Sequence, residues 1–179
     1  AGLAWDWFFA GTPRHWLVDV VEDRDIWRFK FPDTKDIHGY LGSLDMDLPT
    51  WWGASRLPRE YVAEKGAGVL GYIASYGRKA AVHQFVTLLG DETFPTMNIA
   101  YQNCSDHLDA LIMTGTTNRA ASFYYSGQSK LFHFSLRSRG DFDVSAIAKV
   151  YGGGGHKNAA GFTLTPVQFS RVIMDSLED

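Results

Sequence analysis

Apolar positions follow two different periods along the chain, which divide it into a helical first part and a strand-rich second part. Between Trp16 and Val21 the apolar residues recur at helical spacing, which predicts an α-helix after the break at Pro13. The run Trp27–Phe31 alternates aromatic and basic residues. This alternation predicts an extended segment that Pro32 ends.

All six tryptophans lie in this first part of the chain, and the last of them is Trp52. Aromatic rings can stack on nucleic-acid bases, but here core packing, or a surface that another part of the protein covers, is the favoured interpretation. The opening segment has the pattern of an amphipathic helix with Leu3 and Trp7 on one face, a face that belongs against a core. We therefore expect the sequence to begin inside a domain.

A long helical pattern links the two parts of the chain. It runs from Pro58 to about Gln84, with apolar residues at spacings of three and four. Gly66, Gly68 and Gly71 interrupt it, and each glycine weakens a helix by about 1 kcal/mol relative to alanine. A long helix between two better-defined regions predicts a connector.

Strand patterns dominate after this connector. The expected order is strand, strand, helix, strand, strand, helix, strand, helix, over residues 85–89, 94–101, 105–113, 120–125, 131–136, 143–150, 160–164 and 166–177. Ser105 and Asp143 are expected to cap two of the helices. The pattern predicts an α/β fold, with a mixed β-sheet packed against helices. The predicted domains are 1–57, a connector at 58–84, and 85–179.

Charge and composition limit the partners. The formal net charge of the 179 residues is −3, whereas proteins that coat long nucleic acids are usually basic. A polyanionic partner is therefore expected to be short or held locally. A single cysteine, Cys104, excludes a disulfide within the chain and fits a reducing compartment. Without an apolar run of membrane-spanning length or a signal segment, we predict a cytoplasmic protein with no membrane partner.

A glycine-rich stretch, Gly152–His156, lies between a predicted helix and the strand near Ala160. Glycine reaches positive φ without a steric penalty, so consecutive backbone N–H groups can form a concave anion nest to which His156 adds a donor. A β-branched residue at Gly154 is then expected to distort the nest. The alternative is a flexible turn that binds nothing.

The surroundings of this stretch resemble a known family. The resemblance rests on a strand end of Ser-x-Arg-Ser, an Asp-Val helix start and a Gly-Gly-Gly-His-x-x-Ala-x-Gly motif, which read here Ser135–Ser138, Asp143-Val144 and Gly153–Gly161. It is similar to the C-terminal DHH-associated domain of the DHH phosphoesterase superfamily. That superfamily includes RecJ-like exonucleases, nanoRNases, cyclic dinucleotide phosphodiesterases and exopolyphosphatase-like proteins. The resemblance covers the chain from about Phe85 to Asp179.

In this superfamily the domain grips the phosphate or nucleotide part of the substrate. The resemblance implies that Arg137 clamps a phosphate, for which a guanidinium fork is suited. Ser138 would add a hydroxyl, and His156 would donate to the same phosphate beside the backbone of Gly153, Gly154 and Gly155. The alternatives are an exposed arginine at a strand end, a serine that caps a turn, and a histidine satisfied by backbone carbonyls.

The same resemblance raises the question of metal ions. The superfamily's Asp-His-His domain holds two Mn²⁺ or Mg²⁺ ions, which clamp the attacking and leaving oxygens. This sequence has no Asp-His-His string; Asp106-His107 is the nearest, and we interpret His107 as a surface residue of a helix. The segment around Asp23 and Asp25 resembles a metal-binding segment, with Asp23 the better match. Solvated carboxylates at a helix end are the alternative, and one carboxylate alone will not hold a divalent ion tightly.

The sequence therefore predicts the end of a catalytic domain, a connector and a complete substrate domain. The parent protein is expected to hydrolyse short oligonucleotides, cyclic dinucleotides or polyphosphate-like substrates with two metal ions, while this chain alone is inactive. A binding-only module for a nucleotide or short nucleic acid is the alternative, and a structural or dimerisation piece is the third hypothesis. The expected partner is a phosphate-containing small molecule or short oligonucleotide, with homodimerisation left open.

Overall fold

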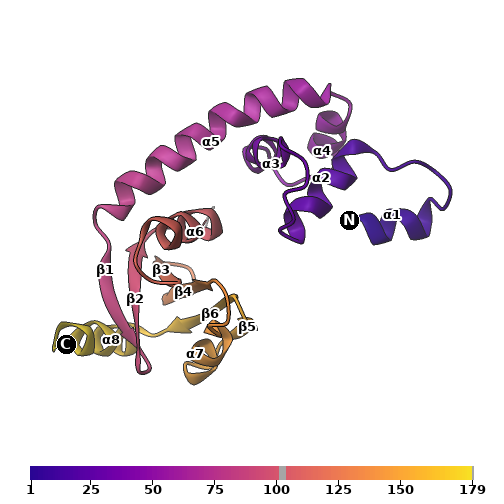
Figure 1. Ribbon diagram of the computed structural model, residues 1–179. Coiled ribbons are helices and arrows are strands. Elements are labelled where there is room, and N and C mark those ends of the chain that lie inside the picture. The colour runs from indigo at the N-terminus through magenta and orange to yellow at the C-terminus, as the bar shows by residue number, and fades with distance from the viewer. Residues whose placement is uncertain (101–103, 179) are drawn as a thin grey trace. The chain divides into compact units, whose positions relative to one another are not determined.

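The computed structural model describes residues 1–100 and 104–178, in two compact units of residues 1–75 and 76–179. The first unit is helical, and the second holds all the strands (Figure 1). No helix among the described residues is long and apolar enough to cross a lipid bilayer.

The first unit packs short helices on the start of a long one. Its elements are α1 (Gly2–Phe8), α2 (Trp16–Asp25), α3 (Thr34–Gly42), α4 (Leu48–Ser55) and the first part of α5 (Arg59–Ala81). Its core consists of buried apolar side chains from four of these helices: Val20, Ile37, Leu41, Ala54 and Val62. The apolar face of α1 is not part of this core, since Leu3 and Trp7 are exposed.

One glycine of α5 is required by packing. A Cβ on Gly66 would lie 1.7 Å from the Asp36 carbonyl oxygen of α3, far inside van der Waals contact. Gly66 therefore allows α3 and α5 to approach closely. The helix propensity lost at this glycine is offset by the burial of neighbouring apolar residues such as Ile37 and Val62.

The predicted extended segment at Trp27–Phe31 is wrong. Residues 26–27 form a turn after α2 and residues 28–30 are irregular, and Trp27 and Phe29 have positive φ values of 58° and 51°. The cause is the buried Asp23 carboxylate, which accepts hydrogen bonds from the backbone N–H groups of Lys30 and Phe31 at 2.8 and 3.2 Å. An alternating sequence pattern predicts a strand only where no buried side chain binds the backbone N–H groups of the segment in this way.

The second unit is a six-stranded mixed sheet, as the sequence predicts, with strand order β1-β2-β3-β4-β6-β5. The β2–β3 pair is parallel and the other pairs are antiparallel. The elements in chain order are β1 (Phe85–Leu89), β2 (Glu92–Asn98), α6 (Cys104–Thr114), β3 (Arg119–Ser126), β4 (Leu131–Ser138), α7 (Val144–Val150), β5 (Gly154–His156), β6 (Ala159–Leu164) and α8 (Pro166–Glu178).

The two faces of the sheet carry different layers. Helices α7 and α8 cover one face, and α6 lies on the other (Figure 1). The larger core, under α7 and α8, is rich in aromatic rings; Phe134 and Phe162 stack across β4 and β6 with ring centroids 4.8 Å apart. The smaller core packs Leu108 of α6 against Met97 and Ala120.

Helix starts and ends in this unit test the predicted caps. Asp143 caps α7 as predicted, since its carboxylate accepts from the N–H groups of Ser145 and Ala146 at 2.8 and 3.3 Å. The prediction for Ser105 is wrong, because α6 begins at Cys104 and already contains it. The second strand ends at Asn98, and the rest of its predicted range reaches Tyr101, which lies outside the described residues.

Candidate functional site

Strand register brings Arg137 and His156 to the two sides of one small residue. Arg137 of β4 pairs with Ala159 of β6, and His156 of β5 pairs with the same Ala159. Directly opposed residues point to the same face of a sheet, with Cα atoms about 4.5–5.5 Å apart. Both side chains therefore flank the Ala159 methyl group, which leaves room between them for a small group.

The floor around Ala159 is also made of small residues. The next row on this face joins Ser135, Gly161 and Gly154 through the same register. A Cβ on Gly161 would lie 2.7 Å from the Phe134 carbonyl oxygen, so a larger residue does not fit there. Three strands thus present a shallow surface whose only long side chains in these two rows are Arg137 and His156.

Part of the glycine-rich stretch, Gly154–His156, forms an edge strand, whereas the sequence pattern predicted a strand only from near Ala160. Gly154–His156 pairs antiparallel with β6, so its N–H groups point alternately toward β6 and toward the open edge. Gly152 and Gly155 have φ values of 77° and 146°. A Cβ added to Gly153 would lie 2.2 Å from the Gly161 carbonyl oxygen. A Cβ added to Gly155 would lie 2.5 Å from the Ala159 carbonyl oxygen.

Gly154 is the unconstrained member of this stretch. It has no positive φ, and a Cβ built on it meets no atom within 4 Å. The expectation that a β-branched residue at Gly154 distorts the backbone is therefore wrong. The close approaches of Gly153 and Gly155 to β6 are the feature that demands glycine here.

The Arg137 guanidinium is half-buried and has only neutral partners among the described residues. Its Nε and Nη2 atoms donate to the Ser105 hydroxyl of α6 at 3.2 and 2.8 Å, and Nη1 donates to the Leu136 carbonyl at 2.8 Å. Its charge is therefore not neutralised by a carboxylate in the described part of the chain. A half-buried cation of this kind attracts an anion more strongly than one in bulk solvent.

Other cations near this end of β4 are already paired. Arg139 donates from Nε and Nη2 to the two carboxylate oxygens of Asp109 at 2.9 and 3.0 Å. Lys157 donates to Asp141 at 2.8 Å, and this contact holds the pKa of Asp141 below its usual value. Arg137 is thus the arginine of this region whose charge is available to a ligand.

Ser138 makes hydrogen bonds that hold the backbone around the site. Its buried hydroxyl donates to the Phe142 carbonyl at 2.8 Å and accepts from the Asn158 amide at 2.9 Å. The Ser138 N–H also donates to the Asn158 carbonyl at 3.2 Å. Because its single proton is given to Phe142, Ser138 here fixes the β5–β6 turn, in agreement with the turn-capping alternative, and does not offer that proton to a phosphate.

His156 is exposed, and its ring makes no hydrogen bond with the described residues that would hold it to a backbone carbonyl. The ring is therefore accessible to a ligand above Ala159. The alternative interpretation, a histidine satisfied by backbone carbonyls, does not agree with this arrangement.

The candidate metal ligands do not form a metal centre. Burial would raise the pKa of Asp23, but hydrogen bonds from the Thr34 hydroxyl and the N–H groups of Lys30 and Phe31 outweigh it and hold the pKa below its usual value. Asp25 is exposed. In the described ranges, no group of three or more His, Cys, Asp or Glu side chains could hold a metal ion. These residues do not fit a two-metal site.

His107 is buried and not a surface residue, which corrects the sequence-based interpretation. A Cβ on Gly77 of α5 would lie 2.1 Å from its Nδ1, and its ring lies 6.2 Å from that of Tyr76. This burial lowers the pKa of His107. The imidazole therefore packs α6 against the end of α5.

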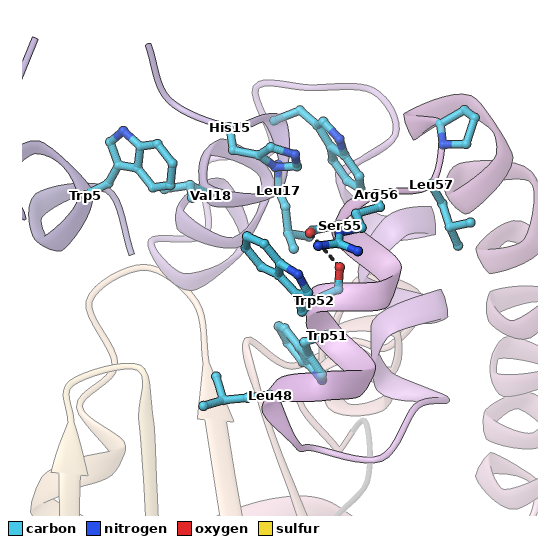
Figure 2. Close-up of a pocket in the computed structure, with 12 residues that line it drawn as sticks. Trp5, His15, Leu17, Val18, Leu48, Trp51, Trp52, Ser55, Arg56 and Leu57 are labelled. Carbon is cyan, nitrogen blue, oxygen red and sulfur yellow. Dashed lines mark hydrogen bonds between the residues drawn. The ribbon is translucent and has the colours of Figure 1, made fainter. Parts of the chain in front are cut away.

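A separate groove of about 980 Å³ lies in the first unit (Figure 2). Its walls are mostly apolar and include four tryptophans, Trp5, Trp16, Trp51 and Trp52. Two of its polar groups are satisfied locally: the Ser55 hydroxyl donates to the Trp52 carbonyl at 2.9 Å, and the His15 ring accepts from the Leu17 N–H at 3.2 Å. The buried Trp51 Nε1 has no hydrogen-bond partner among the described residues. The groove carries no carboxylate and no convergent polar groups for chemistry.

Sequence reasoning missed two contributors to the site. Ala159 belongs to the recognised motif, and its small side chain is the signal that could have marked it as floor. Ser105 lies 32 residues before Arg137, and nothing in the local sequence indicates this contact. It follows only from the packing of α6 on β4.

Part of the chain is similar to a known family of domains. Residues 102–178 match the family described as the DHHA1 domain. An uncharacterized protein of Acanthamoeba polyphaga mimivirus is 24% identical over 188 residues, covering 93% of this chain and 41% of that protein. The chain therefore spans less than half the length of this relative.

Two solved structures extend the comparison. The pGpG-specific phosphodiesterase PggH from Vibrio cholerae matches with a TM-score of 0.57 and 14% identity, over 96% of this chain and 69% of that one. An exopolyphosphatase-related protein from Bacteroides fragilis matches with a TM-score of 0.45 and 15% identity, over 70% of this chain and 40% of that one. The likeness to PggH shows a shared fold. Residues 102–178, within the second unit, therefore match the DHHA1 domain, in agreement with the resemblance that the sequence motifs indicated.

Proposed function

We propose that the DHHA1-like second unit binds the terminal phosphate of a nucleotide or short oligonucleotide on the face of β4, β6 and β5 that carries Arg137 and His156. The observation that carries this proposal is the placement of Arg137 and His156 on either side of Ala159. A phosphate above the Ala159 methyl group can accept from the guanidinium and from the imidazole. Charge-assisted hydrogen bonds of this kind are about twice as strong as neutral ones.

A nucleotide-containing substrate is the class that the comparisons support best. PggH is described as a pGpG-specific phosphodiesterase, and it shares the fold of this chain. The small residues beside Arg137 on this face, Ala159, Gly161 and Gly154, present no long side chain that would occupy the place of a ligand. Cyclic dinucleotides and polyphosphate present similar phosphate oxygens and are further members of the proposed ligand class.

Within the proposed phosphoesterase, this domain supplies substrate binding and orientation. A pair of Mn²⁺ or Mg²⁺ ions, when bound to the catalytic domain of such an enzyme, stabilises the attacking and leaving oxygens. The described residues of this chain hold no cluster that fits those ions, so their proposed share of the reaction is to fix the phosphate. The alternative, a module that binds a nucleotide without catalysis, uses the same surface.

The test is isothermal titration of the full 179-residue chain with 5′-AMP and with adenosine, which lacks the phosphate. We expect 5′-AMP to bind and Arg137→Ala to weaken its binding by about ten- to a hundredfold, the equivalent of roughly 1.5–3 kcal/mol. Arg137→Lys should recover little, because an ammonium does not reproduce the planar fork. Arg171→Ala, which removes an exposed arginine of α8, is the matched control.

Two results would contradict the proposal. Adenosine and 5′-AMP binding with equal affinity would show that the phosphate is not recognised. An Arg137→Ala variant that binds 5′-AMP as tightly as the parent would place the phosphate elsewhere.

A further inference from the structure

The partners of Arg137 leave part of its guanidinium available. The Ser105 hydroxyl oxygen accepts from both Nε and Nη2, and the Leu136 carbonyl accepts from Nη1. Each terminal nitrogen carries two hydrogens, so Nη1 and Nη2 each retain one N–H without a partner among the described residues. Ser105 thus holds the guanidinium while two donors stay available to an anion.

The same face of α6 also binds Arg139, but through a charged group. Ser105 and Asp109 are four residues apart on α6, and so are neighbours on one helix face. Asp109 binds Arg139 through both carboxylate oxygens, which cancels the charge of that guanidinium. Ser105 holds Arg137 through a neutral oxygen and leaves its charge intact.

We propose that Ser105 is a positioning residue for phosphate recognition: its neutral hydroxyl fixes the orientation of Arg137 without neutralising the charge of the guanidinium. This inference rests on the proposed function and deepens it. A long side chain that is already held loses less conformational freedom when its ligand binds. A carboxylate in the same place would hold Arg137 equally well but would compete with the phosphate for its charge.

A pair of variants of nearly equal shape tests this inference. Ser105→Asn presents a neutral carbonyl oxygen to Arg137, and Ser105→Asp presents a negative one. Aspartate is favourable in the first turn of a helix because of the helix dipole, so Ser105→Asp is not expected to lower the melting temperature. Ser105→Thr retains the hydroxyl and serves as the conservative rescue.

The measurement is 5′-AMP affinity by titration calorimetry on the full chain, with thermal melts of each variant. We expect Ser105→Asp to weaken binding by about tenfold or more, as for loss of a charge-assisted contact. Ser105→Asn and Ser105→Thr are expected to stay within about threefold of the parent, a range typical of minor polar changes. A steeper loss for Asp than for Asn cannot arise from helix packing alone.

The outcomes separate this inference from the proposed function. If Arg137→Ala loses binding while the Ser105→Asp and Ser105→Asn variants behave alike, Ser105 does not act through the charge of Arg137 and the inference is overturned. If the parent chain does not distinguish 5′-AMP from adenosine, the proposed function itself fails, and the positioning role falls with it.

Discussion

Replacing Gly155 with alanine should destabilise the second unit far more than the same change at Gly154. Gly155 has a φ of 146°, and its new Cβ would lie 2.5 Å from the Ala159 carbonyl oxygen. Holding a residue other than glycine in such a sparsely populated region costs about 1–3 kcal/mol, and overpacking adds about 1–3 kcal/mol. We therefore expect a loss of roughly 2–6 kcal/mol in the free energy of unfolding.

Gly154 is the matched control because it has neither constraint. Gly154→Ala should change the free energy of unfolding by no more than about 0.5 kcal/mol. Urea denaturation followed by far-UV circular dichroism measures both variants. All six tryptophans lie in residues 1–75, so native tryptophan fluorescence shows whether the first unit remains folded. Equal destabilisation by the two alanines would refute the reasoning from close strand approach.

Two further predictions concern the first unit and the chain's chemistry. The folded-state pKa of Asp23 is lowered, so its contribution to stability is present above the unfolded pKa of about 3.9 and is lost as the pH falls through the lower folded value. The urea midpoint measured by tryptophan fluorescence should therefore decrease as the pH is lowered through that acidic range, and it should decrease less in the Asp23→Asn variant. An equal dependence on pH in the parent and the variant would contradict the stabilising role of the Asp23 carboxylate. The chain alone should not hydrolyse bis-nitrophenyl phosphate with Mn²⁺, because its described residues form no metal cluster; turnover that is abolished by Asp23→Ala would show that they do.

Alternating patterns predicted the sheet well because each strand has one face in a core. In β4, for example, Phe134 and Leu136 are buried under α7 and α8, while Ser135 and Arg137 point the other way. This two-residue period follows directly from strand geometry. The DHH-type motif then identified the part of the sheet where Arg137 and His156 lie.

Tertiary contacts explain what the sequence did not predict. The turns after α2 depend on the Asp23 carboxylate reaching Lys30, Phe31 and Thr34, a set of contacts that overrides the local alternation. The glycine stretch becomes a strand because Gly153 and Gly155 approach β6 closely. Which glycine tolerates a side chain depends on that neighbouring strand, and no spacing rule within the stretch contains this information.

The most direct test of the central claim is a crystal structure of the full chain in complex with 5′-AMP. The proposed site predicts a phosphate above the Ala159 methyl group, within hydrogen-bond distance of the Arg137 terminal nitrogens and the His156 ring, while Ser105 still contacts Arg137. A phosphate bound away from Arg137 and His156, or a nucleotide seated in the tryptophan-lined groove of the first unit, would contradict it.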